Sequence, residues 1–160
     1  MMKNDKISIT NSLQLFSEIS RANRFITDSS INNIKCFGLN LTEFAVLELL
    51  YHKGDQPIQQ IGKRILISSG NMTYVLDKLE ARRYIKRLHC PKDRRVIYAA
   101  LTDEGRNVIC TIFPVHREMI HQLFSELNSV EKDMLIYLLK KIGLNEKKSQ
   151  CKDNLIQNKS

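Results

Sequence analysis

The sequence lacks the features of a membrane protein or a secreted protein. No apolar run approaches the roughly 20 residues that a membrane-spanning helix needs. The first residues, MMKNDKISITNS, contain neither an apolar segment nor a small-residue cleavage site, so they do not resemble a secretory signal. The four cysteines are scattered and form no C-x-x-C pair, which favours reduced thiols over a disulfide framework. We therefore expect a cytoplasmic protein without a membrane partner.

Patterns that support catalysis are also missing. The sequence has no phosphate-binding glycine loop, no serine-nucleophile motif and no metal-ligand set. His116 and His121 are five residues apart, so on a helix they do not share a face as ligands at i and i+4 would. His89 and Cys90 are adjacent on a predicted strand and point to opposite sides. We predict no enzymatic activity, no cofactor and no metal.

Positive charge, in contrast, is abundant. The 25 Lys and Arg residues against 17 Asp and Glu residues give a net charge of +8 and a pI of about 9.4. This balance favours a polyanionic partner such as nucleic acid, and a generic basic surface is the alternative. A chain of 160 residues with 42% hydrophobic residues suits a single domain, residues 1–160, that buries its own core.

The spacing of apolar residues predicts three helices before residue 66. The first occupies about the first 35 residues and ends where Gly38 and Asn40 interrupt the pattern. Thr42 is a suitable N-cap for the second helix, which Gly54 ends. Pro57 suits the first turn of a third helix, whose buried stripe carries Ile58, Ile61 and Ile65.

A fourth helix and a β-hairpin follow. Ser68 or Ser69 is expected to cap the helix, and its inward face carries Met72, Val75, Leu76 and Leu79. Two short alternating runs, YIKRLHC and VIYAAL, flank a charged turn and predict a hairpin. Two short helices joined by a tight turn are typical of a helix-turn-helix, whose second helix can enter the major groove. The hairpin is then a wing, and an arbitrary small α+β domain is the alternative.

Two more helices are expected after the hairpin. Thr102 is the predicted cap of a long helix, which Pro114 should kink or break. Asn128 and Glu131 form a variant of the capping box at the start of a last helix, which is predicted to end at Gly143. Residues 144–160 are polar and patternless, which predicts a flexible tail. The predicted fold class is mainly α with a small β-hairpin.

The solvent side of the fourth helix begins with small hydrogen-bonding residues, where a solvated helix would more often carry Glu and Lys. Such residues can contact base edges or phosphates, and Gly70 permits close approach of the backbone. The alternative is a polar helix start that only resembles a cap. The candidate contact residues are Ser68, Ser69, Gly70, Asn71, Thr73 and Tyr74.

The segments together resemble the MarR family of bacterial winged-helix regulators over about residues 10 to 143. LTEFAVLELL, IGKRILISSGNMTYVLDKLEARRYIKR and DRRVIYAALTDEG stand in the order and spacing of that family. The most specific part is Asp-x-Arg, a short strand and Leu-Thr-x-x-Gly, here Asp93, Arg95, Leu101, Thr102 and Gly105. CPKDRR together with PIQQIGKRILISSGNMTYVLDKLE is similar to the quinone-responsive subgroup of the family.

The resemblance implies an obligate homodimer around a DNA-binding lobe. Helices over 7–37 and 102–143 would interlock between protomers, and the lobe would span 42–101. The segment from Ser68 to Lys78 would be a recognition helix in the major groove of double-stranded DNA. A two-fold dimer predicts a pseudo-palindromic site.

The resemblance also assigns roles to the charged turn. Arg95 would reach into the minor groove and Asp93 would orient its guanidinium, with Lys92 and Arg94 as neighbouring contacts. A guanidinium at a narrow tip suits the negative potential of the minor groove. A solvated turn is the alternative.

The family implies a signal that releases DNA, either a small aromatic or quinone-like effector or oxidation of a cysteine. Cys90 lies among cationic residues that would favour its thiolate, so it is a candidate redox sensor, and a plain strand residue is the alternative. The function predicted from the sequence is a homodimeric, sequence-specific transcriptional regulator, a repressor released by an aromatic compound or electrophile. The alternatives are an architectural nucleic-acid binder that ignores sequence and a protein-interaction module.

Overall fold

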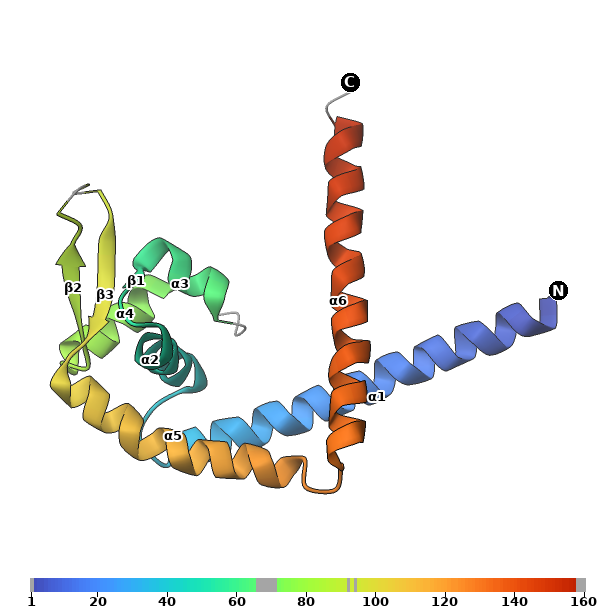
Figure 1. The fold of residues 1–160 in the computed structure, drawn as a ribbon, viewed down its shortest axis with the longest axis horizontal. Helices are drawn as coiled ribbons and strands as arrows, with labels where there is room; N and C mark the ends of the chain where they lie inside the picture. Colours follow the sequence, from blue (N-terminus) through green and yellow to red (C-terminus); the bar gives the residue numbers. More distant parts are fainter. Residues whose placement is uncertain (1, 66–71, 92, 94, 158–160) are drawn as a thin grey trace. The chain divides into compact units, whose positions relative to one another are not determined.

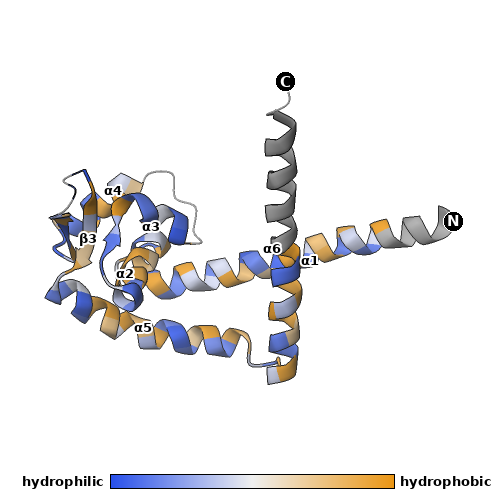
Figure 2. Ribbon diagram, turned by 45° about the horizontal axis from the view of Figure 1, so that its top comes forward, coloured by the Kyte–Doolittle hydropathy of each residue, from blue (hydrophilic) through white to orange (hydrophobic). Residues whose placement is uncertain are grey.

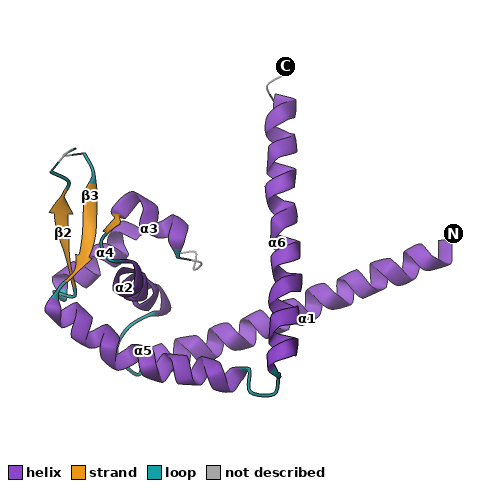
Figure 3. Cartoon of the chain, viewed as in Figure 1, coloured by secondary structure: helices purple, strands orange, loops and turns teal. Residues whose placement is uncertain are grey.

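The structure of the protein is a computed structural model that describes residues 2–65, 72–91, 93 and 95–157. Along this part of the chain the elements are α1 (Met2–Lys35), α2 (Leu41–Lys53), β1 (Gln56–Pro57), α3 (Ile58–Arg64), α4 (Met72–Ala81), β2 (Ile85–His89), β3 (Ile97–Leu101), α5 (Asp103–Leu123) and α6 (Ser129–Gln157) (Figure 1). The predicted fold class, mainly α with a small β-hairpin, is confirmed, and the hairpin belongs to a three-stranded sheet (Figure 3). The chain divides into two compact units, residues 1–120 and 121–160, so a single domain stays a prediction.

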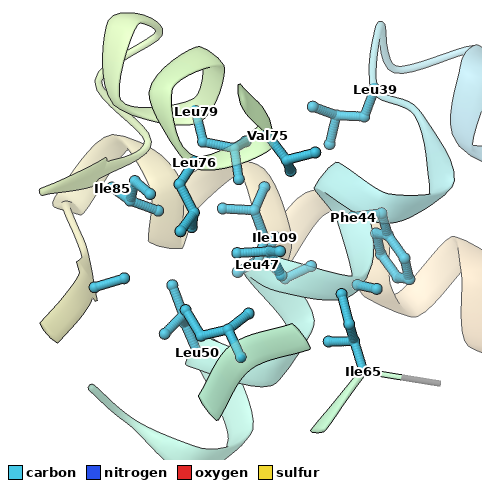
Figure 4. Packing of buried hydrophobic residues seen from close by; sticks show 14 of the residues in the cluster. Leu39, Phe44, Leu47, Leu50, Ile65, Val75, Leu76, Leu79, Ile85 and Ile109 are labelled. Carbon is cyan, nitrogen blue, oxygen red and sulfur yellow. The ribbon is translucent and has the colours of Figure 1, made fainter. Parts of the chain in front are cut away.

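The core of the first unit is built around α2. Phe44, Leu47 and Leu50 from this helix are almost completely buried, and side chains from α3, α4, β2 and α5 pack around them (Figure 4). The inward faces predicted for α3 and α4 are confirmed. Ile61, Ile65, Val75, Leu76 and Leu79 are buried, and Ile58 and Met72 pack partly buried against the same cluster. This packing holds α3 and α4 on a rigid base.

The turn between α1 and α2 uses a capping box that the sequence prediction misplaced. The Asn40 side chain accepts a hydrogen bond from the Glu43 N–H at 2.8 Å, and Glu43 Oε2 accepts one from the Asn40 N–H at 3.0 Å. The prediction that Thr42 caps α2 was therefore wrong by two residues, because Asn40 and Glu43 satisfy two helix-end N–H groups reciprocally. The predicted breaks at Gly38 and Gly54 are confirmed, with φ of 70° and 69°, which glycine adopts without steric cost.

The sheet contains the predicted hairpin and one strand that the sequence did not reveal. β3 is the central strand, and it pairs antiparallel with β2 on one side and β1 on the other. In the hairpin Ile85 pairs with Leu101 and His89 with Ile97. β1 has two residues, which is too short for an alternating pattern, and its Pro57 is tolerated because the strand lies at the sheet edge.

The start of α5 is fixed by the motif Leu-Thr-x-x-Gly. Thr102 Oγ1 accepts a hydrogen bond from the Gly105 N–H at 3.0 Å, which confirms Thr102 as the cap, and it donates to the carbonyl of Arg83 at 2.5 Å. A Cβ on Gly105 would lie 1.9 Å from the carbonyl oxygen of Tyr84, so only glycine fits. Pro114 was predicted to kink or break this helix, and the break does not occur, because α5 is continuous through Pro114. The missing N–H at one position of a 21-residue helix does not end it.

The second unit consists of the end of α5 and α6. Its capping box is confirmed, with hydrogen bonds of 2.9 Å and 3.0 Å between Asn128 and Glu131. The prediction that the last helix ends at Gly143 was wrong, because α6 continues to Gln157. A glycine in a helix costs only about 1 kcal/mol, and the residues after it are compatible with helix. The first half of α6 contains many hydrophobic residues (Figure 2). The large apolar residues of this helix that are exposed are Val130, Met134, Leu135, Ile136, Tyr137, Leu138, Leu139 and Ile142.

Candidate nucleic-acid interface

The helix-turn-helix predicted from the sequence corresponds to α3 and α4, and the β2–β3 hairpin follows as the wing (Figure 1). Some predicted contact residues lie outside the described part of the chain: Ser68, Ser69, Gly70, Asn71, Lys92 and Arg94. The predicted residues that the structure places are Thr73, Tyr74, Lys78, Asp93 and Arg95.

Helix α4 separates its predicted contact residues from its core residues. Thr73 and Tyr74 are exposed near its N-terminus, and 63% of the Tyr74 surface is accessible. Val75 and Leu76, the next two residues, are buried. Because one helical turn has about 3.6 residues, the core anchors one side of α4 and leaves the other side open to a partner.

Lys78, a predicted DNA contact, forms an ion pair within the protein. Its Nζ lies 2.6 Å from Oε1 of Glu43, which is completely buried at the start of α2. The Lys78 side chain is 43% exposed, so its charge is shared between this carboxylate and the surface. Sequence reasoning missed the contact because the two residues are far apart in the chain.

Arg87 links the wing to α4 and was also missed. Its guanidinium bonds to Asp77 at 2.5 Å and to Glu80, and its backbone N–H donates to Glu80 at 3.2 Å. The hydrogen bond to Asp77 and the nearby acidic charges raise the pKa of Arg87, against a smaller effect of burial. Asp77 and Glu80 are one turn apart on α4, so together they present two carboxylates to one strand residue.

The tip of the wing pairs Asp93 with Arg95, as the resemblance implied. Asp93 accepts hydrogen bonds from Arg95 Nε at 3.2 Å and Nη2 at 3.4 Å, and from the Arg95 N–H at 3.0 Å. These bonds lower the pKa of Asp93, so the carboxylate stays charged. The Arg95 side chain is 90% exposed and its guanidinium is oriented by a partner two residues away.

Cys90 lies at the base of this tip. The cysteine is free and half-buried, and its N–H donates to the carbonyl of Val96 at 3.0 Å. The Val96 N–H in turn donates to the carbonyl of Asp93 at 2.9 Å. A bulky group on this thiol would therefore act next to the bonds that shape the tip.

An open groove of about 400 Å³ lies between α2 and α3, and it is large enough for a small aromatic molecule. Burial raises the pKa of Glu48 in its wall, and the charge of His52 opposes that rise. The groove combines apolar and ionisable walls, formed by Ala45, Glu48, Leu49, His52, Lys53, Arg64 and Ile65.

The described residues contain no cluster of three or more His, Cys, Asp or Glu side chains that would hold a metal ion. None of the helices in that part of the chain is long and apolar enough to cross a bilayer.

A helix-turn-helix with a braced arginine at the tip of its wing defines a winged-helix DNA-binding protein, and comparison with known proteins gives the family. The sequence profile of the MarR family matches residues 39–97. The HTH-type transcriptional regulator MhqR of Bacillus subtilis is 51% identical over 136 residues, which cover 85% of this chain and 94% of that protein. The chain therefore belongs to the MarR family, and it is a DNA-binding transcriptional regulator.

Solved structures agree with this fold. A MarR family regulator from Streptomyces coelicolor, solved in complex with DNA, has a TM-score of 0.77 at 20% identity and covers 84% of this chain and 86% of its own. BpsR of Bordetella bronchiseptica, whose structure concerns regulation of DNA binding by 6-hydroxynicotinic acid, has a TM-score of 0.71 at 26% identity. The match with BpsR covers 81% of this chain and 98% of that chain.

Proposed function

We propose that the protein is a cytoplasmic, non-catalytic repressor that binds a pseudo-palindromic operator as a homodimer. In this proposal the segment from Ser68 to Tyr74 enters the major groove, and Arg95 enters the minor groove beside Lys92 and Arg94. Lys78 supports the helix through Glu43 and contributes residual charge to the surface. Repression requires only that the dimer occupy a site that overlaps a promoter.

The pairing of Asp93 with Arg95 is the observation that carries the DNA-binding proposal. An exposed arginine loses side-chain entropy when it binds, and a carboxylate that already orients the guanidinium reduces that loss. Asp93 itself repels phosphate, so its position at the tip is explained by its partner and not by DNA. An arginine held in this way suits the narrow minor groove of A·T-rich DNA.

The test is Arg95→Ala, with Arg24→Ala as a matched control. Arg24 is 86% exposed on α1 and also pairs with an aspartate, Asp28, so the control removes the same charge from a comparable surface position. We expect Arg95→Ala to lower operator affinity about tenfold or more and to reduce the preference for A·T-rich flanks. If both variants bind the operator like the parent in anisotropy titrations, the assignment of the wing is wrong.

The homodimer is supported by exposed apolar residues at both ends of the chain. Leu13 and Phe16 on α1 are 63% and 70% exposed, and α6 carries the exposed apolar residues named above. Exposure of so many apolar side chains to water is unfavourable in free energy unless a partner covers them. We expect a dimer by light scattering, and Leu138→Glu should shift it toward monomer, whereas Lys140→Glu on the same helix should not.

We further propose that the groove between α2 and α3 binds a small aromatic or quinone-like effector that releases DNA. The groove has a mostly apolar lining that also includes Glu48, Lys53 and Arg64, which suits an aromatic ring that carries a hydroxyl or carboxylate. BpsR, whose DNA binding is regulated by a hydroxylated aromatic acid, shares the fold. Calorimetry with hydroquinone and 6-hydroxynicotinic acid tests the site. Arg64→Ala should weaken binding of the acid, and Lys63→Ala should not.

Cys90 remains the alternative sensor. In a variant with Cys36, Cys110 and Cys151 replaced by serine, alkylation with iodoacetamide would modify Cys90 alone. Release of the operator after alkylation would support a redox or electrophile switch. Unchanged operator binding would remove that role and leave the groove as the proposed sensor.

Two rival functions make different predictions. An architectural binder would bind operator and random DNA equally, and a protein-interaction module on the same scaffold would bind neither. We favour the specific regulator because Thr73 and Tyr74, which are exposed on α4, are neutral residues whose hydroxyl groups can donate and accept hydrogen bonds.

A further inference from the structure

Glu43 carries a charge in the core of the DNA-binding lobe, and the capping box does not explain why. Its Oε2 accepts the hydrogen bond from Asn40 that closes the box. The same pair of hydrogen bonds forms between Asn128 and Glu131 at an exposed helix start, where no burial is involved. Because desolvation of a carboxylate is costly, the burial of Glu43 points to a second use of its charge.

The other oxygen of Glu43 is directed to α4. Oε1 accepts no aligned hydrogen bond from the described residues, and the Lys78 ammonium, 2.6 Å away, balances its charge. The guanidinium of Arg82 lies 3.9 Å from Oε2. Lys78 lies in the last turn of α4 and Arg82 directly follows the helix, so a single buried carboxylate attracts two cations from the C-terminal end of α4.

Arg82 extends this network to the turn between α1 and α2. Its Nη1 donates to the carbonyl of Gly38 at 2.8 Å, and its Nη2 donates to the hydroxyl of Tyr84 at 3.1 Å. The guanidinium also lies 4.7 Å from the centre of the Tyr84 ring, within the range of a cation–π contact. On another side of α4, Arg87 of the wing binds Asp77 and Glu80. Charged contacts therefore restrain the helix from two directions.

We propose that Glu43 is a positioning residue for operator recognition. Its buried carboxylate holds Lys78 and Arg82, which sets the rotation of α4 and keeps the Lys78 charge from binding phosphates without regard to sequence. The proposal rests on the proposed function, in which α4 faces the DNA. Glu43 favours specific binding over non-specific binding, and it does so without contacting DNA.

Glu43→Gln tests this role, because glutamine can keep the capping box while the negative charge is lost. We expect the ratio of operator affinity to random-DNA affinity to fall about tenfold, which is within the range for residues coupled in one ion-pair network. The released Lys78 should neutralise one more phosphate, so the slope of log affinity against log salt for random DNA should steepen by about 0.9. Anisotropy titrations between about 50 and 200 mM salt measure both quantities.

Two matched controls separate positioning from stability. Glu131→Gln makes the same substitution in the exposed capping box, and Asn40→Ala removes the buried box but leaves the ion pair. Both should keep the parent ratio and salt slope. If Asn40→Ala lowers the ratio as much as Glu43→Gln does, or if Glu43→Gln changes neither quantity, the proposal is overturned.

Two further variants keep the test decisive. If Glu43→Gln does not fold, the double variant Glu43→Gln with Lys78→Gln removes both charges together. This double variant should have a lower ratio of operator affinity to random-DNA affinity than the parent, and the same salt dependence for random DNA. If the ratio equals that of the parent, the proposal is overturned. Thr73→Ala tests α4 itself. If Thr73→Ala lowers operator affinity and Glu43→Gln does not, only the role of Glu43 is wrong. If both variants bind the operator as tightly as the parent, α4 is not part of the DNA interface.

Discussion

Replacement of Gly105 by alanine should destabilise the junction between the wing and α5. The new Cβ would lie 1.9 Å from the carbonyl oxygen of Tyr84 and 2.7 Å from its carbonyl carbon, so the backbone has to move by about 1 Å. The same Tyr84 oxygen accepts a hydrogen bond from the Thr102 N–H at 3.1 Å, so this movement also strains the cap of α5. Overpacking of this kind costs about 1–3 kcal/mol, and loss of a cap costs about 1 kcal/mol.

Alanine recovers about 1 kcal/mol of helix propensity, so the expected net loss in the free energy of unfolding is about 1–3 kcal/mol. Thermal unfolding should then show a melting temperature lower by about 2–12 °C for a chain of this size. Gly143→Ala is the matched control, because no atom of the described residues lies within 4 Å of a Cβ there. It should stabilise by about 0.5–1 kcal/mol. Both variants are compared at one protein concentration, because dimerisation shifts apparent stability. If Gly105→Ala is as stable as Gly143→Ala, the predicted steric clash between a side chain at position 105 and the Tyr84 carbonyl does not occur.

Three other measurements test single contacts in different parts of the structure. Burial lowers the pKa of His116, so its contribution to stability should be complete above about pH 6.5 and fall as the pH drops toward the lowered value. His116→Asn should flatten that part of the pH profile in urea unfolding, and an unchanged slope would contradict it. Arg87→Met should raise amide exchange in the wing and weaken operator binding several-fold, and parent-like exchange would contradict the role of Arg87 in holding the wing to α4. Asn128→Ala should cost about 1 kcal/mol by removal of a helix cap, and no loss in thermal unfolding would contradict the capping box.

Local signals in the sequence predicted most of the fold. Apolar periodicity located the helices, alternation located the hairpin, and the caps at Thr102 and Asn128 were identified from residue type. The misplaced cap at Thr42 has a simple cause. Asn40 and Glu43 have the same type and spacing as Asn128 and Glu131, but Thr42, a residue of high capping preference, stood closer to the apolar run.

Contacts between distant residues were beyond such reasoning. The ion pair of Glu43 with Lys78 joins positions 35 apart in the sequence, and no spacing rule connects them. From the sequence alone, Glu43 is expected to be a solvent-exposed residue of a helix cap. It is buried because α4 packs on α2. The pairing of Arg95 with Asp93 was implied by the family resemblance, and the hydrogen bonds from Arg95 to Asp93 form between two residues of one tight turn.

The most direct test of the account compares the affinity of the protein for its own upstream region with its affinity for random DNA of equal length. The comparison should be made at several salt concentrations, because phosphate contacts alone make any affinity depend on salt. We expect the upstream region to bind about a thousand-fold more tightly near physiological salt. Equal affinity for both duplexes would contradict sequence-specific regulation and leave a binder of the phosphate backbone.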